Sequence, residues 1–256
     1  MNYQYLNILG TMSGTSLDGI DISVVRTNGV KLERLNKNFF FKFNNKTQKK
    51  LFEFIRTSRF DLYDQNISEI EDLLTNEYIN AIFKSNLIDN CDAIGFHGQT
   101  IYHNPKKKVS LQIGDPKKIV DFFDKKIIYN FRQNDLKNEG QGAPLVPIFH
   151  NVLGNKINKK FNLGFPLNFL NIGGISNITS TVDWKNLEHK LDNINAYDIG
   201  PGNCMIDEWI RKNSKKKYDN DGLIAKSGMT DKLILNQALE NFEENSTYKK
   251  SLDIKD

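Results

Sequence analysis

The sequence has 256 residues, and its 35 Lys and Arg against 31 Asp and Glu give a formal charge of +4. Because 29 of the 35 cations are Lys and the chain also holds 32 Asn, a bias typical of an A/T-rich gene, this charge is weak evidence for a nucleic-acid partner. Its two cysteines form no CxxC pair, so we expect neither a disulfide framework nor a cysteine metal cluster. No apolar run is long enough to span a membrane and no signal-peptide pattern opens the chain, so we expect a soluble, cytoplasmic protein.

Strands and helices alternate through the first half of the chain. Alternating or β-branched residues predict strands at 5–9, 20–26 and 32–43. A helix is expected at 47–58. Apolar residues three and four positions apart predict another helix over 66–87, with Ser68 as its N-cap. A further strand starts at Ala93 and is expected to end at Gly98.

The second half repeats this pattern. Strands are expected at 126–129, 169–172 and 175–182, and a helix at 144–153 is followed by a polar surface segment at 155–162. In both halves a glycine-rich loop joins two strands. The pattern favours an α/β fold made of two related domains, residues 1–125 and 126–256, with a cleft between them.

The first stretch that carries chemistry is GTMSGTSLDGID, residues 10–21. Its glycines and hydroxyl residues can present N–H and O–H donors to phosphate oxygens. Asp18 and Asp21 would repel phosphate themselves, so we expect at least one of them to hold Mg²⁺ that bridges to the phosphate. The stretch lacks the GK[ST] of a Walker loop, and a strand follows it instead of a helix. A simple hairpin turn is the alternative interpretation.

The second stretch is NFRQNDLKNEGQGAPLVPIFH, residues 130–150. Asp135 follows a predicted strand and precedes a Gly-Gln-Gly-Ala-Pro turn, so its carboxylate is expected at the end of the strand, where α/β proteins place their sites. A general base could occupy this position. The alternative is a loop aspartate that caps the following turn.

Two further glycine-rich stretches are NIGGISNIT at 171–179 and AYDIGPGNCMID at 196–207. In the second, Asp198 is expected to end a short strand and Asn203 to open a helix whose start can meet an anion. The alternative is a tight loop with a structural aspartate. His97 and His103 have the wrong spacing for an HExxH metal pair and are interpreted as polar loop residues, with His97 and Gln99 as candidates for sugar-hydroxyl contacts. The lysine runs at 106–108 and 215–217 are interpreted as solvated turns.

Taken in order, these stretches resemble the anhydro-N-acetylmuramic acid kinases, bacterial enzymes of cell-wall recycling with an actin/hexokinase-like, two-domain fold in which each domain is ribonuclease H-like. The resemblance covers nearly the whole chain. Further stretches that carry it are FHGQTIYHNP at 96–105, LQIGDP at 111–116 and YDNDG at 218–222.

The resemblance implies hydrolytic opening of the 1,6-anhydro ring of anhydro-N-acetylmuramic acid and ATP-dependent phosphorylation of the oxygen that is released. Asp135 matches the catalytic aspartate, which deprotonates the attacking water. The resemblance implies ATP and Mg²⁺ as cofactors, metal binding at Asp18 and Asp198, and sugar contacts from His97, Gln99 and Gln141. The residues expected to bind ATP are Gly14, Thr15, Ser16, Leu17, Asp18, Gly19, Ile20, Asp21, Gly173, Gly174, Asp198, Gly200, Gly202 and Asn203. The expected partners are the amino sugar and ATP, with no nucleic acid and no membrane, and the sequence leaves room for a homodimer.

This chain departs from the family at several positions. Asn130 stands where the family usually has Asp, and Lys137 and Glu139 stand where small residues are usual; Glu139 adds a negative charge near a site that must receive ATP. Family members continue beyond the point matching Asp256 with an adenosine-binding motif and closing helices. We therefore expect an incomplete second domain, which argues against robust activity of this polypeptide alone. The alternatives are a non-catalytic sugar- or nucleotide-binding relic and, on the lysine excess, a polyanion binder, against which the lack of interleaved aromatic residues counts.

Overall fold

The computed structural model describes residues 4–14, 16–57, 67–183 and 194–245, which fall into two compact units. Unit 1 comprises residues 1–145 and unit 2 residues 146–256. Both are mixed α/β, so the expected fold class is confirmed. No helix in these described ranges is both long and apolar enough to cross a membrane.

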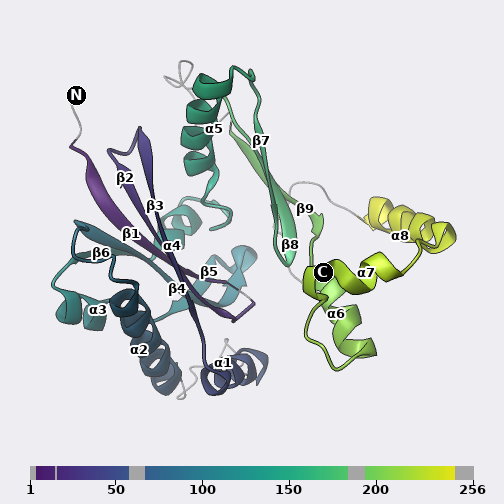
Figure 1. Cartoon of the computed structure of the whole chain (residues 1–256), viewed down its shortest axis with the longest axis horizontal. Helices are drawn as coiled ribbons and strands as arrows, with labels where there is room; N and C mark the ends of the chain where they lie inside the picture. The colour runs from purple at the N-terminus through teal and green to yellow at the C-terminus, as the bar shows by residue number, and fades with distance from the viewer. Residues whose placement is uncertain (1–3, 15, 58–66, 184–193, 246–256) are drawn as a thin grey trace. The chain divides into compact units, whose positions relative to one another are not determined.

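Unit 1 is built on a six-stranded sheet (Figure 1). The strand order is β3-β2-β1-β4-β5, and β6 also pairs with β4. The β1–β2, β2–β3 and β4–β5 pairs are antiparallel, and β1–β4 and β4–β6 are parallel. The strands are β1 (Leu6–Ser13), β2 (Gly19–Thr27), β3 (Leu32–Lys42), β4 (Ala93–Asn104), β5 (Val109–Ile113) and β6 (Lys126–Tyr129).

The strand that begins at Ala93 does not end at Gly98, as we expected, but runs on to Asn104. Its first part, 93–96, pairs with β6, and its last part, 99–104, pairs with β5. Gly98 lies where the partner changes. Its φ is +70°, and a Cβ there would come within 2.6 Å of the Ile113 carbonyl oxygen, so glycine permits the close approach of β5.

Four helices complete unit 1, namely α1 (Asn45–Thr57), α2 (Ile67–Ser85), α3 (Pro116–Phe123) and α4 (Phe131–Lys137). Because α2 already begins at Ile67, Ser68 lies in its first turn and is not its N-cap. Residue 58, where we expected α1 to end, and residue 66, where we expected α2 to begin, lie outside the described residues.

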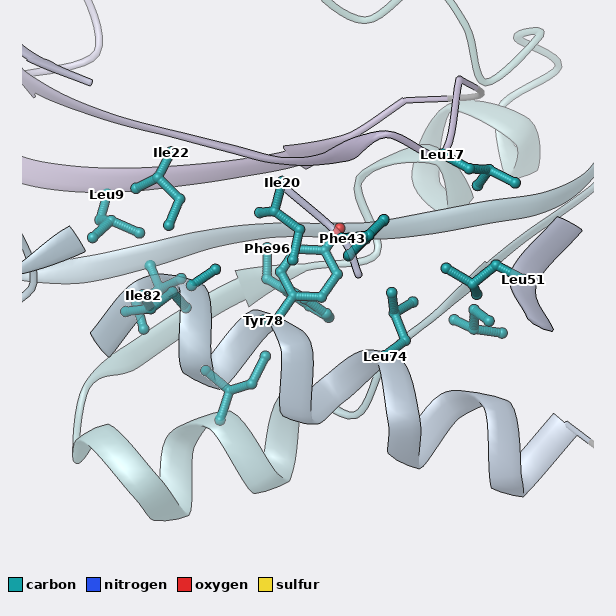
Figure 2. Close-up of a cluster of buried hydrophobic side chains, with 14 of the residues drawn as sticks. Leu9, Leu17, Ile20, Ile22, Phe43, Leu51, Leu74, Tyr78, Ile82 and Phe96 are labelled. Atoms are coloured by element: carbon teal, nitrogen blue, oxygen red, sulfur yellow. The ribbon is translucent and has the colours of Figure 1, made fainter. Parts of the chain in front are cut away.

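The core of unit 1 lies between α2 and the sheet (Figure 2). Leu74, Tyr78 and Ile82 recur every four residues, so they share one face of α2, and all three are fully buried. They pack in one cluster with residues of β1 and β2, including Leu9 and Ile20. Each such side chain contributes roughly 1.5–3 kcal/mol relative to an exposed one. The end of the sheet that carries the candidate site is therefore fixed to a well-packed core.

Unit 2 holds a smaller antiparallel sheet of three strands in the order β7-β8-β9. Helix α5 lies against β8, and Gly154 makes this possible because a Cβ there would come within 2.8 Å of Thr181 Oγ1. The elements are α5 (Pro147–Phe161), β7 (Asn168–Ile172), β8 (Ile175–Ser180), β9 (Asn195–Pro201), α6 (Cys204–Asn213), α7 (Leu223–Ser227) and α8 (Lys232–Asn245). The predicted helix at 144–153 thus starts later, at Pro147, and runs on through most of the polar segment at 155–162.

The division between the units differs from the expected boundary at 125/126. Residues 126–129 form β6, which pairs with β4 of the first sheet, and α4 packs near β5. These long-range contacts assign 126–145 to unit 1 and move the boundary to 145/146. Asp135 therefore belongs to the same unit as the glycine loop at 14–18. A cleft between the two units, and a ribonuclease H-like fold for each, stay predictions.

Candidate functional site

Backbone hydrogen bonds support the described residues of the loop between β1 and β2, namely Gly14 and residues 16–18. The Leu17 amide donates to the Gly14 carbonyl (3.2 Å), and the Asp18 carbonyl accepts from the Phe43 amide (3.0 Å). Leu17 has a φ of +54°, and its side chain is buried in the core. At Gly19 a Cβ would lie 2.2 Å from the Phe41 carbonyl oxygen, so no other residue fits there. The sequence thus fixes the described part of this loop, residues 16–18, against the sheet.

Gln99 supports this loop from β4. The side chain is fully buried, its Oε1 accepts a hydrogen bond from Ser13 Oγ (2.6 Å), and its Nε2 lies within bonding distance of the carbonyls of Gly14 (3.3 Å) and Thr100 (3.1 Å). The amide is thereby committed to the loop and its own strand. A sugar contact from Gln99 stays a prediction, while its support of Ser13 and Gly14 is observed.

Helix α1 supports the loop from another side. Gln48 Nε2 donates to the Leu17 carbonyl (2.9 Å). The start of α1 is itself fixed, since Asn44 Oδ1 accepts from the Thr47 amide (2.8 Å). Glu77 of α2 is buried and accepts from Thr47 Oγ1 (2.6 Å) and Asn44 Nδ2 (3.0 Å). A chain of hydrogen bonds therefore runs from α2 through α1 to the loop.

Asp18 lies in this loop, and Asp21 follows it on β2, so two carboxylates lie close together in the sequence. Ser16 Oγ donates to Asp18 Oδ1 (2.5 Å). Desolvation raises the pKa of Asp21, and the negative charge of Asp18 raises it further. A cation beside the pair would relieve this repulsion, so the residues fit Mg²⁺. In the described ranges no three Asp, Glu, His or Cys side chains gather as a metal cluster, but Mg²⁺ commonly takes only one or two carboxylates together with substrate phosphates.

Two of the expected nucleotide contacts are limited by burial. Ile20 is completely buried and Leu17 nearly so, so their side chains belong to the core of unit 1. Any contact that they make with a nucleotide comes from the backbone. Thr15 lies outside the described residues.

Asp135 lies in the last turn of the short helix α4 and not at a strand end, as we expected. Its carboxylate reaches into the following turn, where Oδ2 accepts from the Gly142 amide (2.7 Å). Gly140 makes this possible because a Cβ there would lie 2.2 Å from Oδ2. The turn-capping interaction that we considered as the alternative is thus present. It engages one carboxylate oxygen, and Oδ1 accepts no hydrogen bond from the described residues. Gln141 lies exposed in this turn.

Arg132 precedes Asp135 by three positions on α4, which places both on one side of the helix. Its Nε and Nη2 lie 3.3 and 3.2 Å from His97 Nε2 on β4, and His97 Nδ1 lies 2.8 Å from the Gly98 carbonyl. Since a carbonyl only accepts and a guanidinium only donates, His97 carries its proton on Nδ1 and is neutral. Desolvation lowers the pKa of His97, and Arg132 adds to this effect. Sequence reasoning named His97 but not Arg132 as a site residue; the three-residue spacing from Asp135 could have pointed to it.

The negative charge of Glu139 has a partner. Lys108, the last residue of the lysine run at 106–108, forms an ion pair with it. The run is exposed, as we expected. The charge that we considered a handicap for ATP is therefore partly compensated within unit 1.

In unit 2 the two glycine-rich stretches are joined by backbone hydrogen bonds. The Gly202 amide donates to the Gly174 carbonyl (2.9 Å) and the Asn203 amide to the Gly173 carbonyl (2.7 Å). A Cβ at Gly202 would lie 2.2 Å from the Gly173 carbonyl oxygen. Asn203 opens α6, as we expected, although its side chain does not cap the helix; the side-chain Nδ2 donates instead to the Ile172 carbonyl (3.4 Å).

Asp198 lies inside β9, opposite Asn177 of β8, and does not end the strand, which continues through Gly200 to Pro201. The structure thus brings together Gly173, Gly174, Gly202 and Asn203 in unit 2. It brings together the loop at 14–18 with Gln99 in unit 1. Shared metal binding by Asp18 and Asp198 stays a prediction, since they belong to different units.

Comparison with known proteins decides the family. The sequence model of the family described as anhydro-N-acetylmuramic acid kinase matches residues 6–249. The chain belongs to this family of kinases. An anhydro-N-acetylmuramic acid kinase of Pelagibacter ubique (strain HTCC1062) is 41% identical and covers 99% of this chain. Those of Shewanella baltica (strain OS155 / ATCC BAA-1091) and Agrobacterium fabrum (strain C58 / ATCC 33970) are 36% and 35% identical over 95% and 97% of it. Membership agrees with the expected actin/hexokinase-like class.

The matched part is about two thirds of each of these relatives, at 67%, 64% and 66% of their respective lengths. One solved structure, titled as an exopolyphosphatase-like protein, aligns with 81% of this chain and 59% of its own at a TM-score of 0.38 and 12% identity. That likeness is too weak to carry an argument.

Proposed function

We propose that the protein acts on 1,6-anhydro-N-acetylmuramic acid, adding water across the anhydro bridge and transferring the terminal phosphoryl group of ATP to the released oxygen. The product is N-acetylmuramic acid 6-phosphate, and the proposed role is in cell-wall recycling. Family membership supports the substrate and the reaction. The loop at 14–18 supports phosphate binding, because its described backbone is held on several sides.

The arrangement of Asp135 carries the proposal for the base. Its Oδ2 is held by the Gly142 amide, which fixes the orientation of the carboxylate. Its Oδ1 is then available to take a proton from water. The water oxygen forms a bond to the anomeric carbon while the bond from that carbon to the bridging oxygen breaks. The bridging oxygen bonds to the γ-phosphorus, ADP leaves, and the proton resides on Asp135.

The proposed Mg²⁺ would be held by Asp18 and Asp21, together with phosphate oxygens, and would offset negative charge on the phosphates when it is bound. Ser16 orients the Asp18 carboxylate by its hydrogen bond. The loop then supplies backbone donors that need little reorganisation on binding. Gly173, Gly174, Gly202 and Asn203 are proposed as a second phosphate-facing segment.

Mass spectrometry of reaction mixtures tests the proposal, because it detects a few turnovers even where the rate is low. We expect the 256-residue chain to convert anhydro-N-acetylmuramic acid to the 6-phosphate only with ATP and Mg²⁺. Asp135→Asn should bind both ligands in calorimetry and form no product. Asp121→Asn, an exposed aspartate of α3, is the matched control and should keep activity.

The second candidate is the non-catalytic relic, favoured by the hydrogen bond that engages the Asp135 carboxylate in capping the following turn. Binding of the sugar or of Mg·ATP without product would support it. Failure of the chain to bind either ligand would contradict both candidates.

A further inference from the structure

Arg132 is a partly buried cation for which no carboxylate serves as a partner in the described part of the chain. Burial lowers the pKa of its guanidinium, and no acidic residue contributes to the shift. No Asp or Glu among the described residues lies within 4.0 Å of it as an ion pair. Its contacts are to His97, which is neutral. A buried charge that lacks a counterion costs stability unless something compensates it.

The geometry around Arg132 leaves part of its fork unused. Two of its nitrogens, Nε and Nη2, face His97 Nε2. His97 is held in turn by the Gly98 carbonyl, at the point of β4 where the strand changes partners. The guanidinium is thus oriented by a second residue that is itself fixed to the sheet, while Nη1 has no acceptor among the described residues. Such pre-orientation suits recognition of an anion with two oxygen atoms.

Arg132 also lies next to the proposed base. It precedes Asp135 by three positions, one turn away on the same side of α4. The two side chains form no ion pair, because the Asp135 carboxylate instead accepts a hydrogen bond from the Gly142 amide. Arg132 and the proposed base therefore start from adjacent turns of one short helix.

We infer that Arg132, oriented by His97, is an anion-binding residue that takes the oxygen atoms of a carboxylate or phosphate group beside Asp135. His97 is then a positioning residue that acts through Arg132, and not a direct sugar ligand. The identity of the ligand rests on the proposed function, whereas anion binding itself does not. Two groups of the proposed substrates have this chemistry, namely the lactyl carboxylate of the sugar and the terminal phosphate of ATP.

The first test is independent of activity and of the natural ligands. D-lactate and inorganic phosphate are titrated into the ¹⁵N-labelled chain, and the side-chain Nε–H resonances of the arginines are followed by NMR. We expect a saturable shift of the Arg132 resonance with at least one anion and none for Arg26, which already pairs with Glu33. If Arg132 responds to neither anion, the inference is wrong, whatever the chain catalyses.

The second test separates the two sources by calorimetry. If the carboxylate is the ligand, the wild type prefers anhydro-N-acetylmuramic acid to the same anhydro sugar without its lactyl group, and Arg132→Met lowers affinity for the acid by roughly 10- to 100-fold. If the phosphate is the ligand, Arg132→Met instead loses the preference of the wild type for Mg·ATP over Mg·ADP. Arg132→Lys should keep part of the affinity because it keeps the charge. Arg26→Met is the matched control. Unchanged preferences in a folded Arg132→Met variant overturn the inference.

A double-mutant cycle tests the role of His97. His97→Phe removes the acceptor for Arg132, so it should weaken anion binding less than Arg132→Met does. In the double variant we expect no loss beyond that of Arg132→Met, because His97 acts through the arginine. Additive losses would contradict positioning and would instead support a direct contact of His97 with the ligand. Thermal unfolding of each variant, followed by circular dichroism, checks the fold.

Discussion

The position of the Asp135 carboxylate requires that residue 140 has no side chain. The Asp135 carboxylate occupies the space that a side chain at position 140 would need, with Oδ2 only 2.2 Å from the place of a Cβ. A side chain at position 140 would therefore displace the Asp135 carboxylate. The orientation of the proposed base is therefore encoded partly in a glycine that carries no chemistry itself.

Gly140→Ala should displace the carboxylate from the Gly142 amide. We expect the free energy of unfolding to fall by roughly 1–3 kcal/mol, as in other overpacked sites, and product formation to fall with it. Urea denaturation and the mass-spectrometric assay measure the two effects. Gly228→Ala is the control, since a Cβ there makes only ordinary contacts, at 3.7 Å or more. A fully stable and active Gly140→Ala variant would contradict the arrangement.

His97 should make stability depend on pH. Its pKa in the folded chain is lowered from 6.5, first by desolvation, so the unfolded chain binds more protons than the folded chain between the two values. The free energy of unfolding should therefore decrease as the pH falls below about 6.5 and level off below the folded pKa. His150, whose pKa burial also lowers, adds to this slope. Denaturation of His97→Phe between about pH 7 and pH 5 should show a smaller slope; an unchanged slope would exclude His97 as a cause.

At the scale of elements, helix α2 stabilises both the core and the phosphate loop. Its apolar face packs on the sheet, while Glu77 fixes the start of α1, whose Gln48 holds the Leu17 carbonyl. The loop thus depends on an element far from it in the sequence.

Glu77→Ala would leave Thr47 Oγ1 and Asn44 Nδ2 without their acceptor. We expect a loss of about 1–3 kcal/mol in the free energy of unfolding, because the Thr47 hydroxyl is buried and would keep no acceptor. Hydrogen exchange should also rise at the amides of residues 14–18. Glu208→Ala, which removes an exposed pair with Lys212, should change stability little. If exchange in the loop is unaffected, α1 does not support it.

The sequence predicted most strands well, because alternation and β-branching are local signals; the predicted strand at 20–26 is observed at Gly19–Thr27. It failed at Gly98, where a lone glycine suggests a strand end but the strand instead changes partners, which is a non-local event. It also missed α4, because seven residues are too few for helical periodicity to show. The support of the loop by Gln99 could not be predicted either, since it depends on the pairing of β1 with β4.

At the scale of the molecule, the two units differ in how much apolar core they hold. Of the buried hydrophobic side chains in the described residues, all but Ile210 belong to unit 1. Unit 2 exposes many large apolar side chains instead, among them Leu170, Ile172, Met205, Ile206, Trp209, Leu223, Leu233, Ile234, Leu235 and Leu239. An apolar surface of this extent is unusual for an isolated soluble domain.

We therefore expect residues 1–145 expressed alone to unfold cooperatively, and residues 146–256 alone to lack a cooperative transition and to bind the apolar dye ANS. Calorimetry and dye fluorescence of the two pieces check this. A sharp transition in the isolated second piece would contradict the assignment of the stable core to unit 1.

The reaction proposed for the whole molecule is tested most directly by the fate of the water oxygen. In H₂¹⁸O with ATP, Mg²⁺ and anhydro-N-acetylmuramic acid, the chain should form N-acetylmuramic acid 6-phosphate with ¹⁸O on the anomeric carbon and none in the phosphate, and Asp135→Asn should form none of it. The position of the label is read promptly by tandem mass spectrometry, because the anomeric oxygen exchanges with water. Unlabelled product incubated in H₂¹⁸O measures this exchange. Label in the phosphate group, or equal product from Asp135→Asn, would contradict the account.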